Sequence, residues 1–466
     1  MDLLSLDATE IARLILSKKI SPVEIIEAYL NQIEKFNPSI NAIVTLADRS
    51  IDRARKAEQA IMRGEKWGPM HGVPFTIKDC IDTSGTRTTI GSLIYQNNVP
   101  SIDATVVKRL SNSGGILIGK TNLPEFALWW ETGNRIFGQT NNPWDLKRTP
   151  GGSSGGEAAA IASRMSPIGV GSDVGGSIRE PANYCGIVGL KATHGRIPLT
   201  GHWPDVLLRY MHVGPLSRTV RDASLALSIL SGSDGIDAYS LPLDPPIINL
   251  DPSINGLKIA LCTEGYFDPV DPEVKQKVLN AAKIFEEMGC HIETNSLDSW
   301  HNLSAQSISD SLFTAEGQYW LKEVVQGKEK LLAPNIKSRL SKKPPSMEEY
   351  QQAISDSDSL KQDVAKLFYK YDLLICPTVP GPAHLHNSNT LEIDEQKVPA
   401  RNALRATVPF DITGSPSVSV PFGKSSNGLP IGVQIIGRHL DEETVLRAAA
   451  KLEASNQGGY HVPPGF

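Results

Sequence analysis

The stretches GGSSGGE at 151–157 and GGSIR at 175–179 each set serine among glycines, and GVPFTIKD at 72–79 carries a lysine after an apolar run. Hydrolysis of an acyl group by a serine requires a nucleophile, a base that takes its proton, and donors for the oxyanion. These stretches contain candidates for all three groups without a histidine. We therefore expect a hydrolase that combines serine with lysine and acts on acyl groups.

Ser177 is the candidate nucleophile because bare backbone leads up to it. The stretch SPIGVGSD at 166–173 has the composition of a short buried strand, and Val174, Gly175 and Gly176 follow it. Glycines allow N–H groups to converge where side chains would collide. A helix that begins near Ser177 would direct its free N–H groups and positive dipole end to the same point. This loop is therefore the expected place of an oxyanion hole.

Lys78 is the candidate base, because the apolar residues of GVPFTIKD can remove water from it. Burial disfavours the ammonium form and lowers the pKa of a fully buried lysine by roughly 3 to 5 units. A lysine of this kind can accept a proton at neutral pH. Ser153, flanked by glycines, is small enough to lie between Lys78 and Ser177 and to relay the proton.

Motifs throughout the chain resemble, in the same order, those of the amidase signature family. The spacing of the two serines, 177 − 153 = 24, also agrees with that family. The motifs are GVPFTIKD (72–79), GKTNLPEFA (119–127), FGQTNNPW (137–144), TPGGSSGGEAAA (149–160), GSDVGGSIREPA (171–182), CGIVGLKATHGRIP (185–198), YDLLICPT (371–378), GSPSVSVPFG (414–423) and GLPIGVQIIG (428–437). The resemblance thus covers most of the chain.

The resemblance implies roles for particular residues. The catalytic triad would be Lys78, Ser153 and Ser177, with Ser153 held in a cis conformation. The oxyanion hole would be formed by Val174, Gly175, Gly176 and Ser177. No metal site and no other cofactor is expected.

The substrate pocket is expected around the segment ALWW at 127–130. Aligned on FGQTNNPW, it falls where relatives with lipid amide substrates contribute pocket residues. The expected substrate-binding residues are Ala127, Leu128, Trp129 and Ser153, while Trp130 would extend an apolar or aromatic wall. The tract at 201–215 is a candidate for another side. Such a pocket favours a small, apolar acyl or aryl amide.

Two motif matches offer alternatives. GGILIGKT at 114–121 satisfies a phosphate-binding pattern, but its apolar interior favours a buried strand and Pro124 stands where a helix should begin. GGSSG at 151–155 fits the nucleophile elbow of α/β-hydrolases, which would make Ser153 the nucleophile. Asp411 with His439 or His461 would then complete its triad. This elbow is the alternative at the level of residues, although no strand signal leads into it.

The order of apolar and helical segments indicates an α/β fold, with a large mixed β-sheet covered by helices on both faces. Nothing in the 466 residues resembles a flexible linker, so we expect one domain over 1–466. Its expected parts are a helical N-terminal region (1–65), a catalytic core (66–235), a variable and largely helical region (236–400), and C-terminal strands with a helix that return to the core (401–466).

Composition narrows the expected partners and location. A net charge of −5 gives no electrostatic case for nucleic acid. No run of 18 apolar residues predicts a membrane span. Five scattered cysteines lack metal-ligand spacing and fit a reduced, cytoplasmic setting, and the histidines at 194, 202, 384 and 386 lack a zinc motif. The expected partner is a small-molecule amide, and a homodimer is possible.

Three function classes remain open from the sequence. The first, which we favour here, is a free-standing amidase that hydrolyses linear amides through an acyl-enzyme. The second is the A-type subunit of a glutamine-dependent amidotransferase that acts on tRNA-linked acyl groups. The third is a catalytically silent binding module, against which Lys78, Ser153 and Ser177 argue. The acidic composition and the divergent region 236–400 favour the first class over the second.

Overall fold

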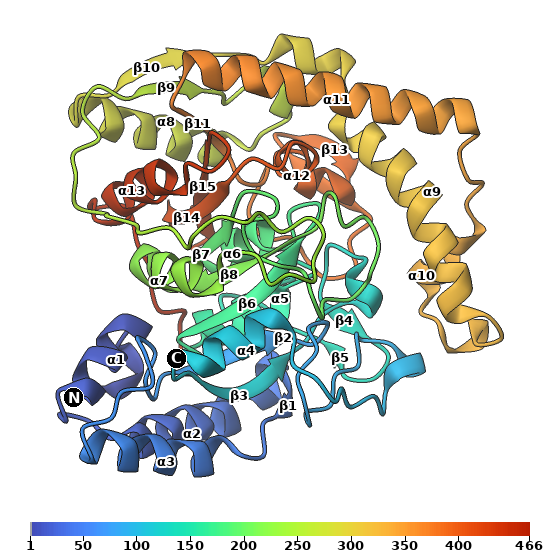
Figure 1. The fold of residues 1–466 in the computed structure, drawn as a ribbon. Coiled ribbons are helices and arrows are strands. Elements are labelled where there is room, and N and C mark those ends of the chain that lie inside the picture. Colours follow the sequence, from blue (N-terminus) through green and yellow to red (C-terminus); the bar gives the residue numbers. More distant parts are fainter. Residues whose placement is uncertain (1) are drawn as a thin grey trace.

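The computed structural model describes residues 2–466, and its centre is a mixed sheet (Figure 1). Across residues 2–466 this sheet contains eleven strands in the order β1-β3-β2-β6-β8-β7-β14-β15-β11-β9-β10. They are β1 (Ile43–Leu46), β2 (Pro74–Lys78), β3 (Ile116–Thr121), β6 (Ile168–Asp173), β7 (Val188–Lys191), β8 (His212–Ser217), β9 (Lys258–Leu261), β10 (His291–Thr294), β11 (Leu373–Pro377), β14 (Ser417–Lys424) and β15 (Pro430–Gly437). The pair β2–β6 is parallel and β6–β8 is antiparallel, so the predicted mixed sheet is confirmed.

Helices cover both faces of this sheet, as predicted (Figure 1). One face carries α4 (Thr105–Asn112), α7 (Val220–Leu230), α8 (Pro272–Glu287) and α13 (Glu442–Glu453), and the other carries α5 (Gly155–Ala162) and α6 (Arg179–Cys185). The N-terminal helices α1 (Ala8–Leu16), α2 (Pro22–Ile40) and α3 (Ser50–Met62) lie together at one end. Two small hairpins, β4 (Gly133–Asn134) with β5 (Gly138–Gln139) and β12 (Thr390–Ile393) with β13 (Gln396–Pro399), lie outside the sheet.

The region 1–65 is not entirely helical, because β1 forms one edge of the sheet. The Asn37 side chain fixes the start of this strand by accepting hydrogen bonds from the N–H groups of Ala42 and Ile43, each at 2.9 Å. β1 has only four residues, which is too short for periodicity to separate a strand from a turn.

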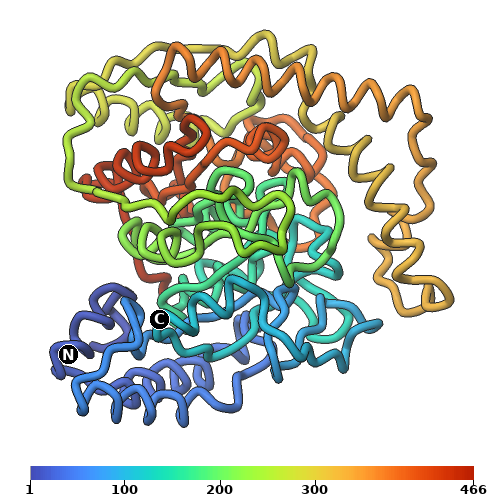
Figure 2. The backbone as a smooth tube through the Cα atoms, viewed as in Figure 1, coloured from blue at the N-terminus to red at the C-terminus, as the bar shows by residue number. Residues whose placement is uncertain are grey.

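The region 236–400 is also less helical than expected, since it contains β9, β10, β11 and the hairpin β12–β13. Its α-helices are α8 (Pro272–Glu287), α9 (Ala305–Val325), α10 (Pro334–Ser341) and α11 (Met347–Lys370). Figures 1 and 2 show α11 crossing one end of the molecule while α9 and α10 descend along its side. Through α9 and α10 this region reaches the candidate site.

The phosphate-loop alternative fails on structure. β3 forms as a largely buried strand over Ile116–Thr121, and the following segment continues as a loop with a single short 3-10 helix, η3 (Glu125–Ala127). A phosphate site of this type needs an open loop followed directly by a helix.

Close packing between α5 and the loop after β3 gives a testable stability difference. A Cβ atom at Gly156 would lie 2.4 Å from the backbone nitrogen and oxygen of Asn122, whereas one at Gly317 in α9 would meet nothing within 4 Å. We expect Gly156→Ala to lower the free energy of unfolding by about 1–3 kcal/mol through overpacking. The matched Gly317→Ala should raise it by about 0.5–1 kcal/mol, because alanine is the better helix former.

Urea unfolding followed by circular dichroism measures both free energies. A Gly156→Ala protein as stable as the parent would show that α5 can move away from Asn122 without cost.

Candidate active site

Lys78 ends β2 with its ammonium nitrogen fully buried. Its Nζ lies 2.7 Å from Ser153 Oγ and 3.1 Å from Ser172 Oγ. Burial lowers the pKa of Lys78 to about 8, against smaller opposing effects from Cys80 and the carboxylates of Asp173 and Glu157. The structure thus places a lysine with a lowered pKa in direct contact with Ser153.

Ser153 lies in a tightly held loop ahead of α5. The peptide bond between Gly152 and Ser153 is cis, the conformation that the family resemblance implies for this serine. The next residue, Ser154, donates its N–H to the Ser177 carbonyl at 3.2 Å. Ser153 and Ser177 line one narrow cavity, so the three residues predicted as a triad are brought together at one place.

Asp173, the last residue of β6, organises the loop that carries Ser177. Its carboxylate accepts the N–H of Gly176 at 2.5 Å and that of Ile178 at 3.0 Å. It also pairs with Arg179, with Nε at 3.0 Å. Burial alone would raise the pKa of Asp173, but the charge and hydrogen bonds of Arg179 lower it well below its ordinary value. Asp173 is therefore ionised and braces the loop.

The same contacts refine the expected oxyanion hole. The Gly176 N–H points to Asp173, so of the four predicted residues Val174, Gly175 and Ser177 remain as candidate donors toward a substrate. α6 begins at Arg179, two residues beyond Ser177, which places its N-terminus beside the candidate nucleophile. Donors of this kind stabilise a developing oxyanion when they are fixed in advance.

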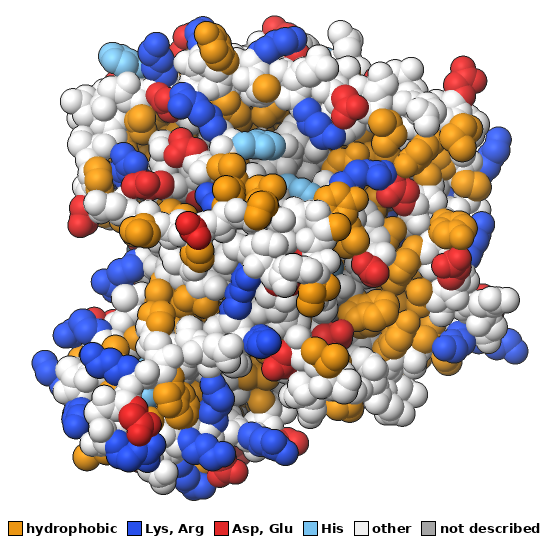
Figure 3. Space-filling model, viewed as in Figure 1, with side chains coloured by type: hydrophobic (Ala, Val, Ile, Leu, Met, Phe, Trp, Pro, Cys, Tyr) orange, Lys and Arg blue, Asp and Glu red, His pale blue; other side chains and the backbone are white. Residues whose placement is uncertain are grey.

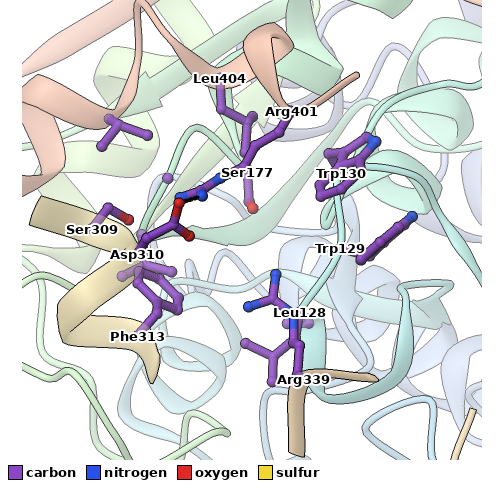
Figure 4. A pocket seen from close by; sticks show the side chains of 14 residues that line it. Leu128, Trp129, Trp130, Ser177, Ser309, Asp310, Phe313, Arg339, Arg401 and Leu404 are labelled. Carbon is purple, nitrogen blue, oxygen red and sulfur yellow. Dashed lines mark ion pairs between the residues drawn. The ribbon is translucent and has the colours of Figure 1, made fainter. Parts of the chain in front are cut away.

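A pocket opens over Ser177 (Figure 4). Ala127, Leu128 and Trp129, three of the four predicted substrate-binding residues, line it together with Trp130, whereas the fourth, Ser153, lines the adjoining cavity. The rings of Trp129 and Trp130 are stacked, with centroids 3.8 Å apart. Residues of the predicted tract 201–215, including Leu207 and Met211, line the adjoining cavity beside Ser153.

The opposite wall of the pocket comes from residues that the sequence did not indicate. Figure 4 shows Asp310 and Phe313 facing the tryptophans, with Arg401 and Arg339 at two further sides. Ser309, Asp310 and Phe313 belong to α9, Arg339 to α10, and Arg401 to the 3-10 helix η7 (Ala400–Leu404). No motif marks these positions, because separate helices meet only in the folded chain.

These residues make the pocket charged. Arg401 forms an ion pair with Asp310, and both residues line the pocket. Burial lowers the pKa of Arg401 to about 10, which leaves its guanidinium charged at neutral pH. Arg339 lines the same pocket, and its Nε has no hydrogen-bond partner among the described residues. The pocket thus combines an apolar wall with two cations and one anion.

The nucleophile-elbow alternative lacks its base. The hydrogen bond to Ser153 Oγ comes from Lys78. His439 Nε2 is instead bonded to the Thr413 carbonyl at 2.7 Å, and Asp411 accepts from Arg179 at 2.8 Å. Within residues 2–466, no set of three or more His, Cys, Asp or Glu side chains is grouped closely enough to hold a metal ion.

Most of the chain matches one protein family. The model of the Amidase family matches residues 24–446. The A-type subunit of the glutamyl-tRNA(Gln) amidotransferase of Carboxydothermus hydrogenoformans is 36% identical over 489 residues, which cover 98% of each chain. The protein of the same name from Sulfurihydrogenibium sp. is 35% identical and covers 99% of each chain.

Solved structures agree with this family. A chain from an inhibitor-bound complex linked to the origins of an s-triazine catabolic enzyme has a TM-score of 0.91, with 29% identity over 98% of this chain and 100% of its own. A bacterial aryl acylamidase of the amidase signature family reaches 0.87, with 29% identity over 97% and 96% of the chains. The A-type subunit of the Thermotoga maritima glutamyl-tRNA(Gln) amidotransferase reaches 0.79, with 29% identity over 99% and 98%.

These relatives correct two expectations. The expectation of a free-standing hydrolase of a small apolar amide is wrong, because the curated relatives that match over nearly their full length are amidotransferase subunits. The pocket also contains the charged residues Arg339, Arg401 and Asp310. The expectation of a small-molecule partner without nucleic acid is wrong for the same reason, since those relatives are named for a tRNA. Net charge misled here because it averages over the whole surface.

Positive side chains are concentrated on one part of the surface, although the net charge of the chain is negative. In Figure 3, Lys and Arg side chains gather over the N-terminal helices. Arg55, Lys56, Arg63 and Lys66 are among the exposed cations there.

None of the helices in residues 2–466 is long and apolar enough to span a membrane.

Proposed function

This chain belongs to the amidase family, and from that premise we propose that it is the glutamine-hydrolysing subunit of an amidotransferase that amidates a tRNA-linked acyl group. It is an enzyme that acts on carbon–nitrogen amide bonds. The observation that carries the proposal is the similarity to the A-type subunit of glutamyl-tRNA(Gln) amidotransferase, at 36% identity over 98% of both chains. The charged pocket over Ser177 supports it.

We propose that Ser177 is the nucleophile of this reaction. Its Oγ attacks the carboxamide carbon while its proton passes through Ser153 to neutral Lys78, whose Nζ lies 2.7 Å from Ser153 Oγ. The N–H groups of Val174, Gly175 and Ser177 are the candidate donors to the oxyanion. The same relay returns the proton to the nitrogen as the C–N bond breaks, so ammonia leaves and an acyl-enzyme remains. Water then attacks this ester and releases the acid.

Recognition of glutamine follows from the charges around the pocket. An α-amino acid head group carries one carboxylate and one ammonium, and a bidentate guanidinium suits a carboxylate. Arg339 is the candidate for that carboxylate, while Asp310, paired with Arg401 in this structure, is the candidate for the ammonium. Leu128 and Phe313 would cover the methylene groups of the side chain.

We propose that residues 1–466 work as one catalytic domain. Support comes from the sheet, to which all four expected regions contribute: β1 from 1–65; β2, β3, β6, β7 and β8 from 66–235; β9 to β11 from 236–400; and β14 with β15 from 401–466. A cytoplasmic location is proposed with it, because all five cysteines are buried and free, as in proteins of a reducing compartment.

The function is tested by ammonia release from glutamine, measured for the purified chain and again with its copurifying partners and a charged tRNA acceptor. We expect release in both cases and transfer to the tRNA-linked acyl group only with the partners. If neither preparation releases ammonia from glutamine, the proposal is wrong.

Arg339→Leu is expected to raise KM for glutamine about 10-fold to 100-fold with little change in kcat. The reason is the loss of a charged hydrogen bond to the substrate carboxylate, which is worth about 1.5–3 kcal/mol. Arg55→Leu, at a surface arginine paired with Asp52, is the matched control and should leave both constants unchanged. An equal KM for Arg339→Leu and the parent would remove Arg339 from substrate binding.

A further inference from the structure

Glu180 is a fully buried acid in the first turn of α6, three residues after Ser177. It lies outside both cavities that contain Ser177, so it is not placed to touch a substrate. The relay from Ser177 to Lys78 makes no use of it. A buried carboxyl group is costly to keep unless it makes specific hydrogen bonds.

The contacts of Glu180 join the two serine loops. Its side-chain Oε2 accepts the N–H of Gly152, the residue before Ser153, at 2.8 Å. Its backbone N–H donates to the carbonyl of Gly176, the residue before Ser177, at 2.8 Å. One residue therefore bonds to the neighbour of each catalytic serine.

The fit around this carboxyl group is tight. A Cβ atom at Gly151 would lie 2.5 Å from Glu180 Oε2, so the loop can approach only because a glycine stands there. Other hydrogen bonds hold the loop on either side of the Gly152 N–H. Thr132 Oγ1 donates to the Gly151 carbonyl at 2.8 Å and accepts from the Gly155 N–H at 3.1 Å, and the Ser154 N–H donates to the Ser177 carbonyl at 3.2 Å. Glu180 is thus the contact closest to Ser153 on its N-terminal side.

We infer that Glu180 is a positioning residue, which holds the Ser153 loop in register with the Ser177 loop so that the proton relay stays aligned. Its action passes through Gly152 to Ser153. The inference rests on the proposed assignment of Ser177 as nucleophile.

The electrostatics are consistent with a neutral acceptor. Burial raises the pKa of Glu180 well above its ordinary value, and the Gly152 N–H opposes this only in part. The carboxylates of Glu131 and Asp173 raise it further. These effects favour the protonated, neutral form of Glu180, and glutamine is the closest mimic of that form in both shape and charge.

The test compares Glu180→Gln, which keeps a carbonyl acceptor for Gly152, with Glu180→Leu, which removes it. The readouts are kcat, KM, and the rate at which a fluorophosphonate probe labels Ser177. Glu180→Gln should stay within about threefold of the parent in all three. Glu180→Leu should lose about 10-fold to 100-fold in kcat and in labelling rate with KM nearly unchanged, because a misplacement of about 1 Å can cost that much.

Asp222→Leu serves as the matched control for loss of a buried carboxyl group. Asp222 is also fully buried, but it accepts the N–H groups of Ala8 and Thr9, both at 2.8 Å, outside the candidate site. It should lower Tm while leaving kcat and the labelling rate of the folded protein unchanged.

Two results would overturn the inference. One is a Glu180→Leu protein with a lower Tm and a parental labelling rate, which would make Glu180 merely structural. The other is a Glu180→Gln protein as impaired as Glu180→Leu, which would show that an acceptor for the Gly152 N–H is not what Glu180 supplies. If Glu180→Leu does not fold, Glu180→Asp takes its place. This variant withdraws the acceptor by one methylene and should show the same loss of kcat and labelling rate. A fully active Glu180→Asp protein would overturn the inference. Labelling of Ser177→Ala by the probe would instead contradict the proposed function.

Discussion

Ser177→Ala is expected to abolish covalent labelling by a fluorophosphonate probe and to lower turnover on the order of 10⁶-fold, the size found when a serine nucleophile is removed elsewhere. Its hydroxyl lies in the pocket, next to the loop that Asp173 braces. Without that hydroxyl no acyl-enzyme can form. Mass spectrometry of the labelled peptide measures the site of modification directly.

Ser228→Ala on α7 is the control, since Ser228 bonds only to the carbonyls of Ser224 and Pro246. It should be labelled at the parental rate. A probe found on Ser153, with Ser177 unmodified, would restore the nucleophile-elbow alternative and refute the assignment.

Lys78→Met is expected to lower turnover by about 100-fold to 10,000-fold, the usual cost of losing a general base. Lys78→Arg should be equally inactive, because a guanidinium keeps its charge and cannot accept a proton. Lys78→Met should also unfold at a higher temperature than the parent at neutral pH, since it removes a buried ammonium group whose charge disfavours folding. Steady-state kinetics and thermal unfolding measure the two effects.

The pH profile gives an independent check on Lys78. Because burial lowers its pKa to about 8, the neutral form increases as pH rises through about 8, and so should kcat/KM. Below that value activity should fall about tenfold per pH unit. A profile that stays flat between pH 6 and 9, or a Lys78→Met protein with parental turnover, would exclude Lys78 as the base.

The candidate triad could be located from sequence because each member lies in a short, distinctive motif. The glycines around Ser153 and Ser177 and the apolar run before Lys78 all have local physical causes. The contact between Lys78 and Ser153 could not be derived in this way, since β2 and the loop before α5 meet only in the fold. β1 was missed because a strand of four residues at a sheet edge leaves no periodic pattern.

The substrate pocket was predicted on one side only. Leu128 and Trp129 lie close to the catalytic motifs, so their place was found, and alone they favoured an apolar amide. Arg339 and Asp310 lie on helices far along the chain. The spacing of apolar residues in those helices predicts only that each helix is half-buried, so it does not mark these two side chains as part of a pocket. The error about substrate class arose from that missing wall.

The strand order also determines when the sheet can form during translation. β14 and β15 lie between β7 and β11. The two halves of the sheet are therefore not joined by hydrogen-bonded strands until residue 437, the end of β15, has been made. Until then the edge of β11 that pairs with β15 stays bare, and such edges invite pairing with other chains. Long-range pairing of this kind slows folding, so a chain still being translated exposes this edge until its last strand has been made.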